Sequence, residues 1–470
     1  MRLKALAALL ILAFALFGLN GCGGAEQENS LTVCILGADD GSNQRYSTNA
    51  NLLTKELAEK INKYGNLQIE VVEIPVTRWP DGQEEQEANL KRMQVEIMSG
   101  KGPDLFILPG VSDFDENNLI INPEKSMAAG FFADLTDLTR ADPEWEKLIT
   151  PVMDAGKYED RQYLIPLRYY SPMLLVLKEE FDKLGLNASA LSESTDSFLS
   201  EAADADSILW KKSVTELAMW NFYSCFDDSA IDYRTQQLNL REEDVLKTVE
   251  RYQTLSDGTQ DTEKKTDGKG AFAWGEGFLT EQNPVLSGNS PGAFLPTVAE
   301  LKHTETEYMI LPLPNSRGRI TPVVSYYGAV SASCKNIPAA YDFIRLFFSP
   351  TVQSGAVGEL ELGGQTLQVD ASEFDAYVGW PVRGDIDTGA LWEAYQERYI
   401  FDYEAKELNL VLNDEDISLP IDRFDRGRIQ SQLDDEFRIS LTGPYYKGEE
   451  IDPQALAREL YKLLLAAAVE

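Results

Sequence analysis

The sequence LTVCIL at residues 31–36, with LQIEVVEI at 67–74 and DLFIL at 104–108, decides the fold. Each stretch has the length and the apolar content of a buried strand. The segments between them carry apolar residues at helical spacing, at Leu52, Leu53, Leu57 and Ile61 and again at Leu90, Met93 and Ile97. This strand–helix–strand–helix–strand order predicts an α/β lobe with a mostly parallel sheet.

In such a sheet, ligands bind in the loops at the carboxyl ends of the strands. Here those loops cover residues 39–42, 77–79 and 109–113, so Asp39, Asp40 and Trp79 are candidate ligand contacts. The alternative for the two aspartates is an Asx turn, and the alternative for Trp79 is packing on the surface.

The rest of the chain mixes strands and helices. Residues 309–313 and 323–331 read as strands, and residues 339–348 read as an amphipathic helix. A last helix is expected from Pro453, because proline is favoured at the first helical position. The polar stretch 188–207 is expected to be a surface loop or a weak helix.

Composition and charge argue against several classes of function. The chain has 470 residues, a formal net charge of −35 and 43% apolar residues, which suits a folded protein of two or three domains. Its acidity repels phosphate backbones, which argues against nucleic acid as a partner. A single histidine, His303, leaves almost no material for a histidine-ligated zinc site or a histidine-based catalytic triad.

The N-terminus has the pattern of a bacterial lipoprotein signal peptide. Two basic residues precede an apolar run at residues 5–19, which is short for a membrane span. The run ends in LNGC at residues 19–22, which resembles a lipobox. We therefore expect residues 1–21 to be removed, Cys22 to carry a diacylglycerol, and residues 22–30 to form a tether. An ordinary secretory peptide or an uncleaved anchor is the alternative.

Nothing in the sequence indicates a metal or a cofactor. The acidic runs at 84–87 and 413–416 lack the spacing of a calcium loop, and no glycine-rich loop has nucleotide-binding spacing. Cys34, Cys225 and Cys334 can form at most one disulfide, and Cys34 and Cys334 read as small buried apolar residues.

A series of short motifs runs along the chain. They are MQVEIMSGKGPDLF at 93–106, FADLTDL at 132–138, YLIP at 163–166, FDKLGL at 181–186, GKGAFAWG at 268–275, LPLP at 311–314 and AAYDFI at 339–344. In order and spacing the series resembles the family 1 extracellular solute-binding proteins, the lipid-anchored substrate receptors of bacterial ABC importers. Two departures leave the ligand open: the family's asparagine is absent from LVLKE at 175–179, and its Pro-x-Thr-Trp is absent after Leu186.

The resemblance implies an α/β, two-lobe periplasmic-binding-protein-like fold of type II, similar to maltose-binding protein. Lobe I would comprise residues 31–167 and 312–378, and lobe II residues 168–311 and 379–470. Three hinge crossovers are expected near residues 166–170, near 308–312 and between 352 and 381. Hinge closure would trap a ligand that contacts both lobes.

The resemblance also implies ligand contacts in a cleft between the lobes. Aromatic rings bind the apolar face of a sugar, while carboxylates and arginine bind its hydroxyls. One tyrosine of each adjacent pair is expected to contact the ligand and the other to pack in the core, because neighbouring side chains of a strand point to opposite faces. The candidates are Tyr169, Tyr170, Tyr326, Tyr327, Trp274, Glu276, Arg383 and Trp220, and core packing is the alternative for Trp220.

The expected function is solute binding without catalysis, at the outer face of a bacterial membrane. The expected partners are a mono- or oligosaccharide and the transmembrane subunits of an ABC permease, with the receptor itself a monomer. One alternative is a lipoprotein of the same fold that senses a ligand or binds a partner protein. Another is a carboxylate-based glycosidase, which needs no histidine.

Overall fold

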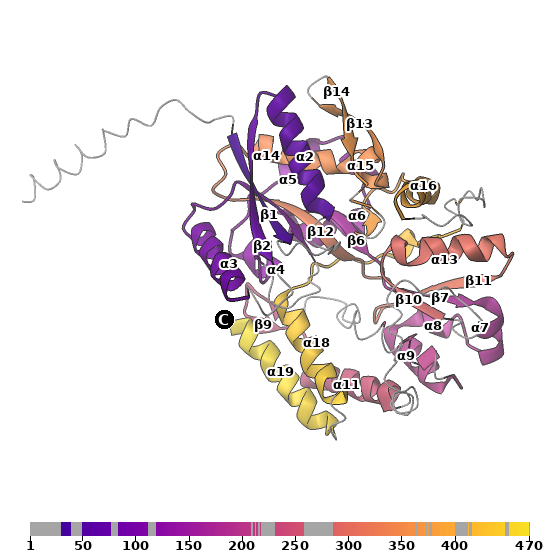
Figure 1. Ribbon diagram of the computed structural model, residues 1–470. Coiled ribbons are helices and arrows are strands. Elements are labelled where there is room, and N and C mark those ends of the chain that lie inside the picture. Colours follow the sequence, from indigo (N-terminus) through magenta and orange to yellow (C-terminus); the bar gives the residue numbers. More distant parts are fainter. Residues whose placement is uncertain are drawn as a thin grey trace, which may run out of the picture.

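The computed structural model contains a large sheet, a small sheet and helices around both (Figure 1). It describes residues 30–38, 49–76, 83–110, 119–207, 210–211, 213–214, 217, 231–257, 285–362, 365–372, 374–375, 378–399, 412, 416–446 and 451–469. Within these ranges no helix is long and apolar enough to cross a membrane.

The large sheet has six described strands in the order β15–β6–β12–β3–β1–β2. They are β1 Ser30–Ala38, β2 Gln68–Val76, β3 Leu105–Pro109, β6 Leu164–Tyr170, β12 Val323–Val330 and β15 Trp380–Pro381. β1 pairs in parallel with β2 and β3, but β12 and β15 run antiparallel to their neighbours. The sheet is therefore mixed rather than mostly parallel. Every residue of β12 is buried, and a strand covered on both faces shows no alternation.

Alternate side chains of the large sheet enter two different cores. On β1, Val33 and Ile35 join the core under α2 (Asn49–Tyr64), whereas Cys34 and Leu36 join the core under α3 (Gln83–Met98). Figure 1 shows α2 and α3 on opposite sides of the sheet. This layered arrangement confirms the strand and helix periods read from the sequence.

The small sheet has three described strands in the antiparallel order β10–β7–β11. They are β7 Met173–Leu177, β10 Val285–Gly288 and β11 Tyr308–Pro312. On β7, Leu175 shares a core with α13 (Pro291–His303), and Leu174 and Val176 point to the other face. Helices cover that other face: α7 Lys178–Leu184, α8 Ala190–Glu193 and α9 Thr195–Asp204.

A third group, called here the helical cluster, lies beside the small sheet. It consists of α11 (Glu242–Asp257), α18 (Gln432–Tyr446) and α19 (Pro453–Val469), with the hairpin of β8 (Ile231–Asp232) and β9 (Gln237–Leu238). An ion pair between Arg251 of α11 and Asp196 of α9 joins it to the helices of the small sheet.

The other described elements surround the large sheet. They are α4 Pro123–Ala128, α5 Thr136–Ala141, α6 Thr150–Met153, β4 Lys157–Tyr158, β5 Arg161–Gln162, α14 Ile337–Arg345, α15 Pro350–Ser354, β13 Val357–Leu362, β14 Gln365–Asp370 and α16 Thr388–Tyr399. Single 3-10 turns follow several of these helices, including Leu346–Phe348 after α14.

The large sheet with its surrounding helices is one body, and the small sheet with the helical cluster is the other. In the described part of the chain, three crossovers connect these two bodies. β6 continues into β7 through Ser171 and Pro172, and β11 returns to β12 through residues 313–322. After β15 the chain leaves the large sheet and later forms α18 in the helical cluster. The first two crossovers lie just after their expected positions, because β6 and β11 extend that far. The third lies beyond its expected range, after α16, where Phe424 forms a bridge with Ile320 of the second.

The second and third crossovers run side by side. Ile320 forms a bridge with Phe424, and the carboxylate of Asp425 accepts hydrogen bonds from Asn315 at 3.0 Å and Arg317 at 2.5 Å. Burial opposes ionisation of Asp425, but these bonds and one from the backbone N–H of Arg426 give a net lowering of its pKa. The two segments are thus tied together by a charged contact.

Candidate functional site

The candidate site is the edge of the large sheet where β3 and β6 end and the chain crosses to the small sheet. The register places Val323 of β12 opposite Tyr170, and Trp380 of β15 opposite Tyr169. β1, β2, β3 and β6 run in one direction, so their carboxyl ends meet at this edge. In open α/β sheets, ligands bind outside this edge.

Asn289, which follows β10, joins the two sheets at this edge. Its backbone carbonyl accepts hydrogen bonds from the backbone N–H of Ser171 at 2.9 Å and from the indole N–H of Trp380 at 3.1 Å. Trp380 is 4% exposed, so its bond to Asn289 is sheltered from water. The small sheet thereby fixes the orientation of an aromatic ring that belongs to the large sheet.

The first tyrosine pair divides between core and surface. Tyr169 is 1% exposed and packs edge to face on Phe424, with ring centroids 5.7 Å apart. Burial raises the pKa of the Tyr169 hydroxyl. Tyr170 is partly exposed at the end of β6. Of this pair, only Tyr170 has surface available to a ligand, and its contact with one stays a prediction.

The second tyrosine pair is buried on both sides of the sheet. Tyr326 joins the core under α2 and packs edge to face on Phe374 at 5.9 Å, whereas Tyr327 joins the core under α3. They are 6% and 2% exposed. The predicted alternation is present, but each ring is buried in a core, so neither is open to a ligand in this structure. The ligand contact expected from this pair stays a prediction.

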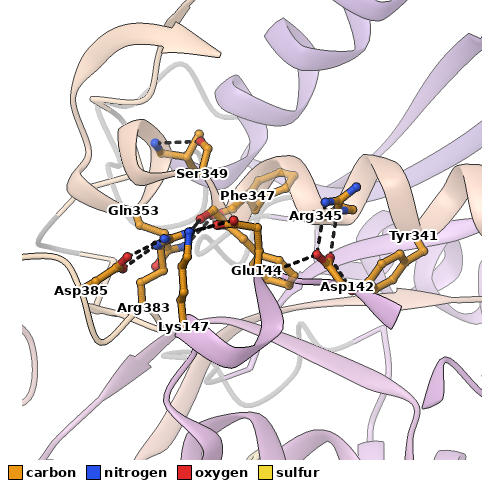
Figure 2. Close-up of polar contacts among 12 residues, drawn as sticks. Asp142, Glu144, Lys147, Tyr341, Arg345, Phe347, Ser349, Gln353, Arg383 and Asp385 are labelled. Carbon is orange, nitrogen blue, oxygen red and sulfur yellow. Dashed lines mark hydrogen bonds and ion pairs between the residues drawn. The ribbon is translucent and has the colours of Figure 1, made fainter. Parts of the chain in front are cut away.

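Arg383 is held by an internal network rather than left open to a ligand (Figure 2). It is 2% exposed. Its Nε and Nη2 donate to the two carboxylate oxygens of Asp385 at 2.7 and 2.6 Å. Its Nη1 donates to Glu144 Oε2 at 2.7 Å and to the carbonyl oxygen of Phe348 at 2.9 Å. Both carboxylates that Arg383 contacts therefore belong to the protein itself.

The electrostatics of this network agree with its geometry. Hydrogen bonds from Arg383 hold the pKa of both Asp385 and Glu144 below their usual values, with a further bond from Lys147 acting on Glu144. The bond to Asp385 in turn raises the pKa of Arg383. Asp385, Glu144 and Arg383 are therefore charged at neutral pH, and none of the three has a proton to exchange there.

A third carboxylate, Asp142, extends the network to α14 (Figure 2). It accepts hydrogen bonds from the Tyr341 hydroxyl at 3.0 Å and from Arg345 Nη2 at 3.2 Å. The backbone N–H of Glu144 donates to Asp142 at 3.0 Å, which links the two arms. Together the contacts tie the loop before α6 to α14 and to the segment after β15. This is a structural role.

Arg168 of β6 is a buried cation that the sequence analysis does not single out. It is fully buried, and its Nη2 donates to the carbonyl oxygens of Val352 at 2.9 Å and Phe374 at 2.5 Å. Its Nε and Nη1 have no hydrogen-bond partner among the described residues, and burial lowers its pKa to about 9. The sequence does contain a sign of this buried cation, because an arginine stands inside the otherwise apolar strand LIPLRYY.

Several predicted residues lie outside the described part of the chain. They are Asp39, Asp40, Trp79, Trp220, Trp274 and Glu276, together with the lipidation site Cys22. The described residues contain no group of histidine, cysteine, aspartate or glutamate side chains that could hold a metal ion. Cys34 and Cys334 are unpaired and buried, and burial raises the pKa of Cys34 to about 12.

Comparison with known proteins identifies the family. A family model described as bacterial extracellular solute-binding protein matches residues 47–354. No curated protein matches the chain.

Solved structures share the fold at low sequence identity. A family 1 extracellular solute-binding protein from Alicyclobacillus acidocaldarius is 11% identical, with a TM-score of 0.51 over 95% of this chain and 100% of that chain. A periplasmic oligogalacturonide-binding protein from Yersinia enterocolitica is 12% identical, with a TM-score of 0.52 over 94% and 100%. A periplasmic solute-binding protein from Pectobacterium atrosepticum is 13% identical, with a TM-score of 0.50 over 94% and 100%.

These likenesses establish the two-lobe α/β fold of periplasmic binding proteins, and the family model covers well over half of the sequence. The chain belongs to the family of bacterial extracellular solute-binding proteins.

Proposed function

We propose that this protein is the substrate receptor of an ABC importer and that it binds a neutral mono- or oligosaccharide between its two lobes. The observation that carries the proposal is the junction at Asn289, where the residue that follows β10 of the small sheet contacts Ser171 and Trp380 beside the partly exposed Tyr170. A ligand at this edge would touch both bodies, which is what hinge closure requires.

The ligand class is argued from aromatic residues and charge. Tyr170, Trp79 and Trp274 offer rings for the apolar face of a sugar, and Asp39, Asp40 and Glu276 offer acceptors for its hydroxyls. The relative from Yersinia enterocolitica is described as binding oligogalacturonide, which is an acidic carbohydrate. A net charge of −35 disfavours such a polyanion here, so we propose a neutral sugar.

The remaining features follow the same proposal. Lobe I comprises residues 31–170 and 323–399, because β6, β15 and α16 lie in or around the large sheet, and lobe II comprises residues 171–311 and 432–470, with approximate boundaries. Cys22 carries the lipid that holds a monomeric receptor at the outer face of the membrane. The receptor binds and releases its ligand without catalysis, and the permease subunits perform the transport.

A thermal-shift panel tests the ligand class. Neutral mono- and oligosaccharides, amino acids, peptides and polyols are added to the purified protein, and unfolding is followed by tryptophan fluorescence. A ligand at about 100 times its Kd stabilises the folded state by about 2.7 kcal/mol. This corresponds to a rise in Tm of about 5–11 °C for a lobe of about 150–250 residues that unfolds as one unit. A shift with peptides or amino acids and none with any sugar would contradict the carbohydrate proposal.

Two substitutions test the site once a sugar is found. Tyr170→Ala and Trp274→Ala are each expected to reduce or abolish the ligand-induced shift. Tyr461→Ala is the matched control, because Tyr461 is also a partly exposed tyrosine but lies on α19 of the helical cluster. If both variants keep the full sugar shift, the site is elsewhere.

The lipid anchor is tested by detergent phase partitioning in a bacterial host. The wild-type protein is expected in the detergent-rich phase and the Cys22→Ser variant in the aqueous phase. Recovery of both in the aqueous phase would indicate an ordinary secreted protein.

A further inference from the structure

Two short turns from different bodies of the protein meet at some distance from the first crossover. One joins β4 to β5 beside the large sheet, and the other joins β8 to β9 on the helical cluster. Figure 1 shows β9 between α4 and α19, well separated in the view from β7 and β10 at the first crossover. Contacts between these turns are made by side chains, so they can break without breaking the chain.

The β4–β5 turn has an unusual backbone. Its two residues, Glu159 and Asp160, have φ of 48° and 61°. Positive φ at both positions is the mark of a type I′ turn, which asparagine and glycine adopt most readily. Glutamate rarely adopts this conformation, so the flanking pairs must impose it. Tyr158 packs against the core under α3 and anchors the turn to the large sheet.

The β8–β9 turn is also held in one shape. The Asp232 carboxylate accepts hydrogen bonds from the backbone N–H groups of Arg234 at 3.0 Å and Thr235 at 3.1 Å. Tyr233 packs against the core of the helical cluster, and burial raises the pKa of its hydroxyl to about 12. The hydroxyl therefore keeps its proton at neutral pH.

Two contacts cross the boundary: one joins the N-cap of α4 to the β8–β9 turn, and the other joins the two turns. The Asn122 side-chain amide donates a hydrogen bond to the Tyr233 hydroxyl, and the Oδ1 of Asn122 accepts from the backbone N–H of Lys125 at 2.9 Å to cap α4. Beside it, Arg234 Nη1 lies 3.0 Å from Glu159 Oε1. Asn122 and Glu159 belong to elements around the large sheet, whereas Tyr233 and Arg234 belong to the helical cluster.

We propose that the β8–β9 turn is a latch: Tyr233 and Arg234, through Asn122 and Glu159, stabilise the described arrangement of the two bodies against one opened about the crossovers. The latch sets the open-to-closed ratio of the unliganded protein. It requires the hinge motion of the proposed function but does not depend on which ligand is bound.

The test measures the distance between the bodies without ligand. Nitroxide labels are placed on exposed positions by Lys91→Cys in α3 and Lys462→Cys in α19, in the mature chain with Cys22→Ser and Cys225→Ser. Cys34 and Cys334 are buried and are expected to stay unlabelled. Pulsed electron–electron double resonance then gives the distribution of distances between the two labels. The fraction of molecules at the longer distance reports opening.

Charge reversal supplies the variants. Arg234→Glu and Glu159→Arg are each expected to raise the open-to-closed ratio several-fold, and the double reversal to return it toward the wild-type value. Tyr233→Phe removes the other contact at constant shape, and combined with Arg234→Glu it is expected to raise the ratio about tenfold. Arg140→Glu is the control, because Arg140 is an equally exposed arginine whose ion pair with Asp137 lies within α5.

Two results would overturn the latch. One is a wild-type distribution in Arg234→Glu, Glu159→Arg and the Tyr233→Phe combination, with folding verified by circular dichroism. The other is opening by the single reversals without recovery in the double reversal. Either result leaves the ligand panel unaffected, so failure of the latch is distinguishable from failure of the proposed function.

Discussion

Replacing Arg383 by methionine decides between a structural and a ligand-binding role for this residue. Methionine keeps most of the apolar volume but removes every hydrogen bond that Arg383 donates to Asp385, Glu144 and the Phe348 carbonyl. Breaking a buried ion pair costs about 3–5 kcal/mol when the remaining charge is stranded. Here the side chains of Glu144 and Asp385 are 35% and 48% exposed and can regain water. We therefore expect the low end, about 3 kcal/mol.

The loss is measured by urea unfolding and by thermal melts. About 3 kcal/mol corresponds to a fall in Tm of about 6–12 °C for a lobe of about 150–250 residues that unfolds as one unit. Arg140→Met is the matched control, because its partner Asp137 lies at 3.0 Å but the two side chains are 72% and 96% exposed. An exposed pair of this kind contributes less than about 1 kcal/mol, so the control is expected to unfold almost like the wild type.

The pH dependence gives a second readout of the same network. The pKa values of Asp385 and Glu144 are lowered in the folded protein, so the stability that they contribute is present above their unfolded pKa values, about 3.9 and 4.3. It is lost as the pH falls through the lower folded values. The difference between wild type and Arg383→Met is therefore expected to be full at pH 7 and to shrink below about pH 4. A variant as stable as wild type that no longer binds a sugar would refute the structural role.

Three further changes have expected effects on stability. Tyr341→Phe removes a hydrogen bond to Asp142, whose side chain is 2% exposed, and is expected to cost about 1–2 kcal/mol in urea unfolding. Gly156→Ala would place a Cβ 1.8 Å from the Leu164 carbonyl oxygen and is expected to cost about 3 kcal/mol or more, whereas Gly384→Ala meets nothing closer than 3.8 Å and should be near neutral in the same assay. Asp425→Asn weakens the contact with Arg317 and Asn315 and is expected to lower the free energy of unfolding by about 1–2 kcal/mol at pH 7. Because the pKa of Asp425 is lowered in the folded protein, this difference should diminish below about pH 4. An undiminished difference at pH 3 would contradict this.

The elements of the fold that local periodicity determines were predictable. The first three strands and the two helices between them lie where the apolar spacing places them, from Ser30 to Pro109. The direction of β12 was not predictable, because all its residues are buried and either direction satisfies the same pattern. The polar stretch 188–207 forms α8 and α9 because Phe198, Leu199 and Ala202 fall on one face of α9 and pack against the small sheet.

The candidate site was predictable only in part. Strand alternation separates Tyr169 from Tyr170, but it cannot reveal that both Tyr326 and Tyr327 are buried, on opposite faces of the sheet. Arg383 reads as a free cation in the sequence, because an aspartate two residues away does not by itself indicate a bidentate contact and the other partner, Glu144, is remote along the chain. Asn289 acts through a backbone carbonyl, which leaves no signal in the residue type.

The place of β12 between β6 and β3 has a consequence for biosynthesis. β6 ends at Tyr170 and β12 begins at Val323, with the whole small sheet encoded between them. A nascent chain that ends before Val323 contains β3 and β6 but not β12, the strand that pairs with both. Each of the two strands then has an unpaired edge. Pairing over such a separation is slow, and open edges invite aggregation until the missing strand arrives. Completion of this sheet is therefore late, which favours export of the polypeptide before it folds and makes C-terminal truncations before Val330 poor choices for expression.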